Sequence, residues 1–381
     1  MTTEVLTCPH PAGGSVKTLC EAFQRTASMR PDAVALRTPG GKQEITWREY
    51  ADRVRKIAAG LASLGVKRGD TVGIMLTNRP EFYLVDTAAL HLGTTPFSIY
   101  NTSSADQIAY LFSNAENKVV FTELAFLPQI TASGAGVEHV ITVDGEAAGA
   151  MSLDALETAG AEDFHFQASW QAVEPADVAT LIYTSGTTGP PKGVELTHSN
   201  LIAEMAAVVG YIDANPGDRT TSYLPSAHVA DRVANHYFSL TRGVQVTSIN
   251  DPREILAALT DARPTIWVAV PRVWQKLKAG IESKVAAEPK QAKRKIALWA
   301  FETGRKKVAL ELAGEKVPAG QGGARCRART GRGRGTALPR PIRDARVPQG
   351  SGEDRGSDRR RGLDAHRRHR GDRRRRLRQD R

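Results

Sequence analysis

One short stretch of the 381-residue chain gathers hydroxyl side chains, glycines and a lysine. Its chemistry-bearing residues are, in chain order, Thr184, Ser185, Gly186, Thr187, Thr188, Gly189, Lys192 and Gly193. Glycine lets backbone N–H groups approach an anion without a Cβ in the way, and hydroxyls donate to phosphate oxygens. A lysine at the end of the loop adds a compact positive charge. The stretch therefore predicts a loop that binds a polyphosphate.

The flanks separate this loop from the Walker A type. A Walker A loop ends in Gly-Lys-Ser/Thr and opens a helix, whereas here Pro191 precedes Lys192 and Gly193 follows it. Residues 194–197 alternate with period two, so the loop joins two strands. The alternative is a hydroxyl-rich surface turn, which is what most Gly/Ser/Thr loops are. The positioned lysine after an apolar strand favours the phosphate loop.

Alternating strands and helices must position this loop. Apolar patterning predicts strands over 71–76, 119–122, 140–143, 179–184, 220–224, 244–249 and 265–270. It predicts helices over 46–64, 80–92, 106–113, 200–211, 230–240, 253–261, 272–283 and 288–312. Thr46 and Glu49 have the spacing of a capping box for the first of these helices. The alternation indicates an α/β fold whose largely parallel sheet is covered by helices on both faces.

The basic charge of the chain comes from its last 61 residues. The whole chain carries a net charge of +11, but residues 321–381 hold 21 Arg, no Lys and 7 acidic residues. This tail has no aromatic residue, so we expect it to be disordered. It is either an Arg-rich arm for polyanions or the product of a shifted reading frame in a GC-rich gene. The abrupt change from mixed Lys/Arg to Arg alone favours the shift.

Composition argues against several other classes of protein. Cys8, Cys20 and Cys326 are too few and too scattered for a disulfide framework or a zinc site. No run approaches the roughly 20 apolar residues that a membrane span needs, and the N-terminus does not resemble a signal peptide. We therefore expect a cytoplasmic protein with at most peripheral membrane association. Because the tail lacks aromatics for base stacking, we expect no specific nucleic-acid partner.

The loop from Thr184 to Gly193 resembles the phosphate-loop signature of AMP-forming adenylating enzymes, the acyl-CoA synthetase and luciferase superfamily. Further segments are similar to its long-chain fatty-acid–CoA ligase branch, and the resemblance extends over about 16–313. These segments are 46–50, 69–70, 78–81, 96–110, 224–232 and 270–274. The resemblance implies the N-terminal lobe of an adenylate-forming enzyme, with two mixed or parallel sheets covered by helices.

The resemblance also implies a two-step reaction. A fatty carboxylate would attack the α-phosphorus of Mg²⁺-bound ATP to give an acyl-adenylate, and coenzyme A would then displace AMP. The residues that would hold the ATP phosphates are Thr184, Ser185, Gly186, Thr187, Thr188, Gly189 and Lys192. Thr184 would also be near Mg²⁺, and His228 would contact the adenylate and the carboxylate. Alternatively, His228 caps the helix after it, and Arg232 and Arg272 are structural ion-pair partners.

The chain departs from the family pattern after Leu312. The family's Gly-Tyr-Gly-x-Thr-Glu, Thr-Gly-Asp and Arg-x-Lys-Asp segments and its catalytic C-terminal lysine do not occur in 313–381. We therefore expect a flexible N-terminus (1–15), a partial adenylation domain (16–313), and the tail (314–381), with impaired activity. Two other hypotheses stay open: a fatty acyl-AMP ligase that loads a carrier protein, and a non-enzymatic polyanion binder.

Overall fold

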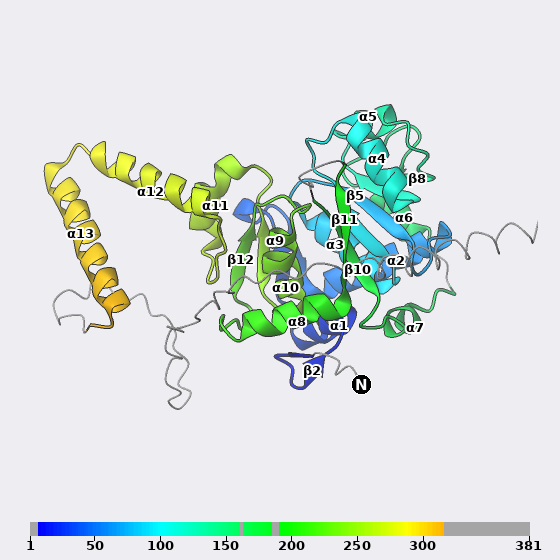
Figure 1. Ribbon diagram of the computed structural model, residues 1–381, viewed down its shortest axis with the longest axis horizontal. Coiled ribbons are helices and arrows are strands. Elements are labelled where there is room, and N and C mark those ends of the chain that lie inside the picture. Colours follow the sequence, from blue (N-terminus) through cyan, green and yellow to red (C-terminus); the bar gives the residue numbers. More distant parts are fainter. Residues whose placement is uncertain (1–6, 161–162, 185–189, 316–381) are drawn as a thin grey trace, which may run out of the picture. The chain divides into compact units, whose positions relative to one another are not determined.

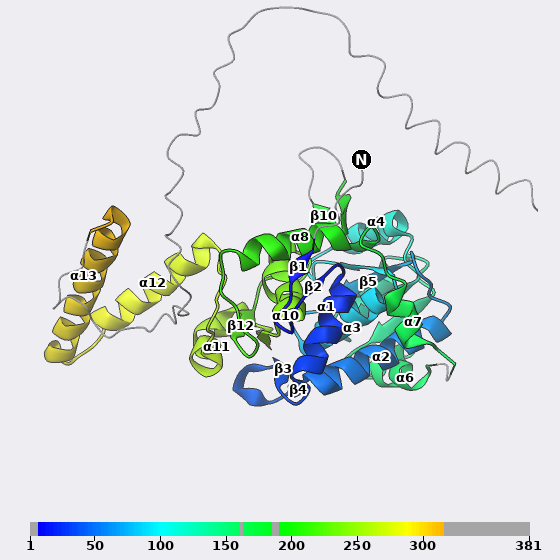
Figure 2. The ribbon, with the colours of Figure 1, turned by 90° about the horizontal axis from the view of Figure 1, so that it is seen from below.

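The computed structural model describes residues 7–160, 163–184 and 190–315. The chain divides into two compact units, Met1–Pro289 and Lys290–Arg381. Both large sheets belong to the first unit, and the helix α13 (Gln291–Ala313) belongs to the second. Figures 1 and 2 show the sheets of the first unit with helices on their faces. The tail that we expected to be disordered lies outside the described residues.

The strands follow the chain in the order β1 (Cys8–Pro9), β2 (Ser15–Val16), β3 (Val34–Arg37), β4 (Glu44–Thr46), β5 (Thr71–Met75), β6 (Thr95–Ser98), β7 (Val119–Thr122), β8 (His139–Thr142), β9 (Met151–Ser152), β10 (Val178–Thr184), β11 (Lys192–Thr197), β12 (Arg219–Ser222) and β13 (Gln245–Ser248). The α-helices of the first unit are α1 (Leu19–Met29), α2 (Trp47–Ser63), α3 (Pro80–His91), α4 (Ala105–Ala115), α5 (Leu127–Ala132), α6 (Leu153–Thr158), α7 (Phe166–Gln171), α8 (His198–Val209), α9 (Val229–Asp231), α10 (Phe238–Arg242), α11 (Ile255–Ala262) and α12 (Pro271–Ala286).

A seven-stranded sheet has the order β11-β10-β6-β5-β7-β8-β9, and a four-stranded sheet has the order β12-β13-β3-β4. In the first sheet only β11 runs antiparallel to its neighbour, and in the second only β4 does. The predicted mixed or parallel sheets covered by helices are confirmed. Parallel strands end at one edge of a sheet, and a crevice at that edge is where α/β folds bind ligands.

Helices pack on these sheets through continuous apolar surfaces. The helix α2 begins with the predicted capping box, because Thr46 Oγ1 accepts the N–H of Glu49 and the Glu49 carboxylate accepts the N–H of Thr46. Its buried stripe includes Tyr50 and Ile57, and it packs against α3, all of whose residues are buried. Among the described helices, none has a segment that is both long and apolar enough to cross a membrane.

Two sequence predictions need correction. The segment 265–270 is not a strand. Its backbone bonds to β12 only through the N–H groups of Thr265 and Ile266, which both donate to the carbonyl of Arg219. Pro264 and Pro271 flank it, and proline supplies no N–H for a ladder. The segment predicted as one α-helix over 230–240 is instead α9, a π-helical turn η2 (Arg232–Tyr237) and α10.

Candidate functional site

A cavity lies where the carboxyl ends of both sheets meet. It has a volume of about 250 Å³, and we call it the strand-end cavity. Its walls are the segments that follow β5 (Leu76–Asn78), β6 (Ile99–Thr102), β12 (Tyr223 and Pro225–Ala227) and β13 (Asn250 and Pro252). These walls present amide, hydroxyl and apolar side chains. The topology thus brings four strand ends, distant in sequence, to one binding surface.

The predicted phosphate loop starts at the same edge. Leu181 of β10 pairs in parallel with Phe97 of β6, so β10 ends at Thr184 on the same edge at which β6 ends and the cavity wall Ile99–Thr102 begins. Thr184 pairs with Lys192 across the antiparallel β10–β11 ladder, and both side chains are exposed. The structure confirms that the loop joins two strands. The other predicted phosphate contacts lie outside the described residues: Ser185, Gly186, Thr187, Thr188 and Gly189.

Two tyrosines attach both stems of the loop to α4. Tyr110 of α4 donates its hydroxyl to the carbonyl of Pro191 over 2.9 Å, just before β11. Tyr183 of β10 donates its hydroxyl to Asn114 of α4, also over 2.9 Å. Burial raises the pKa of Tyr183 to about 12, so this hydroxyl keeps its proton at neutral pH. The stems are therefore held at a fixed spacing.

His228 is exposed at the end of the 223–228 segment. Its Nδ1 accepts the N–H of Ala230 over 3.1 Å, so the side chain caps α9, as one of the two sequence interpretations expected. Because Nδ1 is the acceptor, the neutral ring carries its proton on Nε2. The neighbouring Ser226 and Ala227 line the strand-end cavity. The capping bond leaves Nε2–H as the group that could reach a ligand.

A group of hydrogen-bonded polar side chains, most of them buried, lies next to the strand-end cavity. Asn78 donates to Ser222 Oγ over 2.8 Å and to the carbonyl of Leu224 over 2.7 Å. Ser222 Oγ in turn donates to the carboxylate of Asp231 over 3.0 Å, and Asn235 donates to it over 2.7 Å. Burial raises the pKa of Asp231 to about 6. These bonds join the segment after β5 to the segment after β12.

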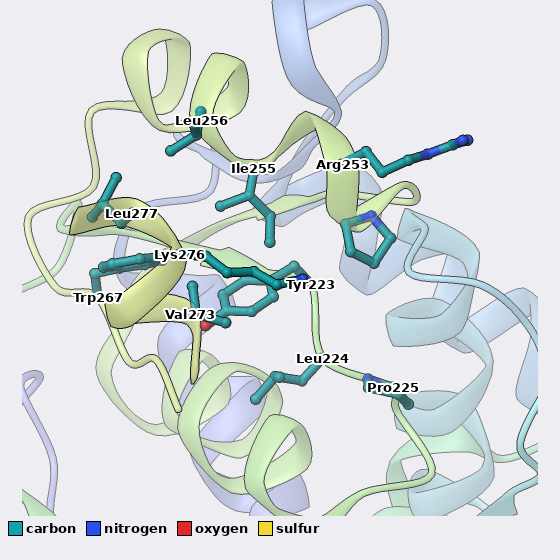
Figure 3. Close-up of a pocket in the computed structure, with 11 residues that line it drawn as sticks. Tyr223, Leu224, Pro225, Arg253, Ile255, Leu256, Trp267, Val273, Lys276 and Leu277 are labelled. Carbon is teal, nitrogen blue, oxygen red and sulfur yellow. The ribbon is translucent and has the colours of Figure 1, made fainter. Parts of the chain in front are cut away.

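A second, apolar cavity of about 440 Å³ adjoins the first, with Tyr223, Pro225 and Pro252 common to both linings. We call it the apolar cavity. Its other lining residues are Leu224, Arg253, Ile255, Leu256, Trp267, Val273, Lys276 and Leu277. In Figure 3, Tyr223, Trp267 and Lys276 turn toward one another, and Arg253 points away from them. An elongated ligand could thus place a polar end at the strand ends and an apolar end here.

The described residues near Thr184 fit part of a Mg²⁺-nucleotide site. The Thr184 hydroxyl and the Lys192 ammonium are groups that bind phosphate oxygens or complete a metal's oxygen shell. Within the described ranges, no group of three or more His, Cys, Asp or Glu side chains is arranged to hold a metal ion.

Sequence reasoning missed most of the cavity walls. Asn78, Tyr100 and Asn250 line the strand-end cavity, yet none was a candidate site residue. A signal was present, because 78–81 and 99–102 belong to the segments that resemble the acyl-CoA synthetases. Both follow predicted or observed parallel strands, and positions just after such strands are where ligands bind.

The described residues form an α/β domain with a cavity at the carboxyl ends of two sheets, beside a Gly/Thr-rich segment that joins two strands. Residues 23–333 match the family model described as AMP-binding enzyme, which covers well over half of the chain. The chain belongs to the AMP-binding enzyme family.

Particular relatives refine this assignment. The chain is 52% identical over 172 residues to fadD11 of Mycobacterium tuberculosis, whose name describes a fatty-acid–CoA ligase. The match covers 45% of the chain and 30% of that protein. It is 36% identical over 251 residues to the long-chain-fatty-acid–CoA ligase FadD15 of Mycobacterium bovis, covering 64% of the chain and 41% of the relative. The chain thus spans less than half the length of these two ligases.

Solved structures share the fold. The long-chain-fatty-acid–CoA ligase FadD1 of Archaeoglobus fulgidus superposes with a TM-score of 0.63 at 24% identity, over 72% of this chain and 56% of that one. The anthranilate CoA ligase AuaEII, solved with anthranoyl-AMP, gives a TM-score of 0.60 at 21% identity, over 66% and 49% of the two chains. The predicted N-terminal lobe of an adenylate-forming enzyme is confirmed as the fold.

Proposed function

We propose that this chain binds Mg²⁺-bound ATP and a fatty acid at the strand-end edge and serves acyl-adenylate formation, with coenzyme A as the second-step acceptor. The observation that carries the proposal is the shared edge: β10 pairs in parallel with β6, so β10 ends at the edge where the cavity wall that follows β6 begins. A carboxylate is a weak nucleophile, so positioning it against the α-phosphorus and neutralising phosphate charge are the main tasks of such a site.

We assign the phosphate contacts to Thr184, Ser185, Gly186, Thr187, Thr188, Gly189 and Lys192. Lys192 would supply positive charge to the phosphates, since its exposed side chain begins β11 directly opposite Thr184. Thr184 would add its hydroxyl to the shell of Mg²⁺ or to a phosphate oxygen. His228 would donate its Nε2–H to the carboxylate or the adenylate, because its Nδ1 is already occupied by the cap.

The apolar cavity favours a fatty acid over a small polar acid. Its volume of about 440 Å³ is within the usual range of ligand pockets, and aromatic and aliphatic side chains form most of its lining. Apolar surface removed from water contributes roughly 25 cal/mol per Å², so an alkyl chain would gain affinity here. This cavity would hold the acyl chain, and the strand-end cavity would hold the carboxyl end.

The first test is nucleotide binding. We expect the purified chain to bind Mg²⁺-bound ATP by calorimetric titration, and the Lys192→Ala variant to bind it at least tenfold more weakly, because one phosphate-neutralising charge is lost. Lys42→Ala is the control, since Lys42 is an exposed lysine remote in sequence from the loop. Equal affinities of the two variants would contradict the assignment of Lys192.

The second test is acyl-dependent exchange of pyrophosphate into ATP. The family's adenine, ribose and hinge segments do not occur in residues 313–381, so we expect the 381-residue chain to exchange only weakly. Robust exchange would show that these segments are not needed. A carrier protein as acceptor in place of coenzyme A is the alternative within the family, and transfer of a radiolabelled acyl group to each acceptor distinguishes the two.

The Arg-rich tail favours a second, non-enzymatic function. Residues 321–381 carry 21 Arg against 7 acidic residues, a charge that favours polyanions in a salt-dependent manner. We expect deletion of 321–381 to abolish DNA binding at low salt while leaving ATP binding unchanged. DNA affinity that survives the deletion, or that does not fall between 50 and roughly 200 mM salt, would rule this function out.

A further inference from the structure

The π-helical turn η2 and the residue before it turn four polar side chains into the interior. Asp231, Arg232, Asn235 and His236 are each at most 3% exposed. These four residues are spaced so that they lie on one face of the turn, and that face is turned to the interior. Such turns are frequent at functional sites, and this one begins four residues after His228.

Arg232 is the centre of this buried group. Its Nη1 donates to Asp86 of α3 over 2.6 Å and to the Tyr237 hydroxyl over 2.8 Å. Its Nη2 donates to Ser98 Oγ over 2.9 Å, and its Nε donates to the carbonyl of Ser226 over 3.1 Å. Asp86 is paired a second time, because His236 Nε2 lies 2.9 Å from its other oxygen. The buried Arg232 guanidinium is therefore matched by the Asp86 carboxylate.

Two of these partners lie at two different walls of the strand-end cavity. Ser98 is the last residue of β6, and the wall segment Ile99–Thr102 follows it directly. Ser226 belongs to the wall segment after β12 and precedes His228 by two residues. One rigid guanidinium thus bonds to the base of both walls. Asp231, the residue before Arg232, reaches a third wall through Ser222 and Asn78.

We propose that Arg232 is a positioning residue that sets the separation of the two cavity walls, 99–102 and 223–228, and through them the place of His228 beside the strand-end cavity. This inference rests on the proposed function. A purely structural ion pair would need only Asp86. The bonds from Nε and Nη2 go instead to the two walls, and the planar fork of arginine can make them together whereas a lysine ammonium cannot.

Hydrogen–deuterium exchange of single amides tests the proposal in the full chain. Two wall amides are reporters: the His228 N–H donates to the Pro225 carbonyl, and the Ser103 N–H donates to the Tyr100 carbonyl, each over 2.9 Å. We expect Arg232→Lys to accelerate exchange at both by at least tenfold. The Val143 N–H, bonded to the Thr122 carbonyl far along the seven-stranded sheet, should keep its rate.

Two further variants make the outcome specific. Arg53→Lys is the control, because the Arg53 guanidinium makes two donor contacts to one carboxylate, Glu157, and joins α2 to α6 rather than the cavity walls. It should leave both wall amides unchanged. Ser98→Ala removes only one bond and should accelerate Ser103 but not His228. If Arg232→Lys does not fold, this asymmetry decides the question. Unchanged wall amides, or an equal acceleration at Val143, would overturn the proposal.

Nucleotide affinity separates this inference from the proposed function. We expect Arg232→Lys to weaken binding of Mg²⁺-bound ATP at least fivefold and Arg53→Lys to leave it unchanged. Unaltered affinity in a folded Arg232→Lys variant would overturn the positioning role. If the unmodified chain binds no Mg²⁺-bound ATP, the proposed function fails, while the exchange rates at His228 and Ser103 still decide what Arg232 holds in place.

Discussion

The helices α3 and α12 begin in the same way but differ in how far they are buried. Each has proline in its first turn after an extended residue, and neither has a side-chain N-cap. Yet every residue of α3 is buried, whereas no residue of α12 is. Figure 1 shows α3 within the body of the first unit and α12 at its margin. Local helix signals therefore do not distinguish the two helices.

The polar residues of α3 show what full burial requires. Asp86 is paired with Arg232 and His236, and Thr87 Oγ1 lies 2.6 Å from the Tyr50 hydroxyl. His91 lies 3.1 Å from Gln24 through Nε2. On α12, by contrast, Val273, Lys276 and Leu277 line the apolar cavity while Trp274 is 48% exposed. The burial of α3 thus depends on paired polar side chains, whereas α12 contacts the rest of the unit through apolar side chains.

The largest expected difference between the helices concerns charge. We expect Asp86→Ala to reduce the free energy of unfolding by about 3–5 kcal/mol, because it leaves the buried Arg232 without its counter-charge. Glu282→Ala in α12 should cost less than about 0.5 kcal/mol, since its 3.7 Å pair with Lys278 is exposed. Urea unfolding of both variants measures this. A small effect of Asp86→Ala would show that the interior tolerates the unpaired guanidinium.

Truncation of one leucine in each helix sharpens the comparison. Leu84→Ala in α3 should cost about 2–5 kcal/mol, because Leu84 is 0% exposed and its removal leaves a cavity. Leu277→Ala in α12 should cost about 1 kcal/mol or less, since it only enlarges a cavity that is already open. Unfolding midpoints in urea compare the two. Similar losses would mean that α12 is packed as tightly as α3.

Acid should destabilise the buried interior, to which α3 belongs. Burial lowers the pKa of His91 and of His198 to about 4, so the unfolded chain binds protons below pH 6.5 that the folded chain cannot. Stability is therefore full above about pH 6.5 and falls as the pH decreases toward 4. Each histidine should cost about 2 kcal/mol at pH 5.

Asp231 acts in the opposite direction. Burial raises its pKa to about 6, so on acidification the folded chain takes up a proton at this carboxyl before the unfolded chain does. At pH 5 this proton uptake should add about 1 kcal/mol to the free energy of unfolding. For these three groups together, the loss between pH 7.5 and pH 5 is about 3 kcal/mol, and His10 and His236, whose pKa burial also lowers, add to it; urea unfolding at both pH values measures the total. His91→Gln should reduce the loss, and a loss that stays the same would show that His91 is protonated without cost.

The sequence predicted those features that short-range patterns determine. The capping box of Thr46 and Glu49 and the strand–loop–strand around Lys192 are confirmed, as are six strands to within two residues. The π-helical turn η2 was missed because its apolar pattern is compatible with an ordinary α-helix. The strand predicted over 265–270 was wrong because alternation in sequence does not reveal whether a neighbouring strand offers a full ladder.

The cavity could not be predicted from local pattern for a related reason. Asn78, Tyr100, Ser226 and Asn250 are far apart in sequence and meet only because four parallel strands end at the same place. The charge pair of Asp86 and Arg232 is likewise separated by 146 positions and is brought together by packing of α3 against η2. Only topology supplies these contacts, so motif reasoning located the strand–loop–strand around Lys192 but not the groups that support it.

The smallest expected effect is local opening of α12 under native conditions. Its residues are all at least partly exposed, so its amides should exchange through fluctuations that need far less free energy than global unfolding. The N–H of Ala287, bonded to the Ser283 carbonyl over 3.0 Å, is the reporter, and the N–H of Leu92, bonded to the Ala88 carbonyl at the end of α3, is its counterpart. We expect Ala287 to exchange at least a hundredfold faster than Leu92 and to respond little to low urea. A saturating fatty acid should slow exchange in α12 if the acyl chain enters the apolar cavity, since Val273 and Leu277 would then be covered. Equal rates at the two helix ends would show instead that α12 opens only when the whole unit unfolds.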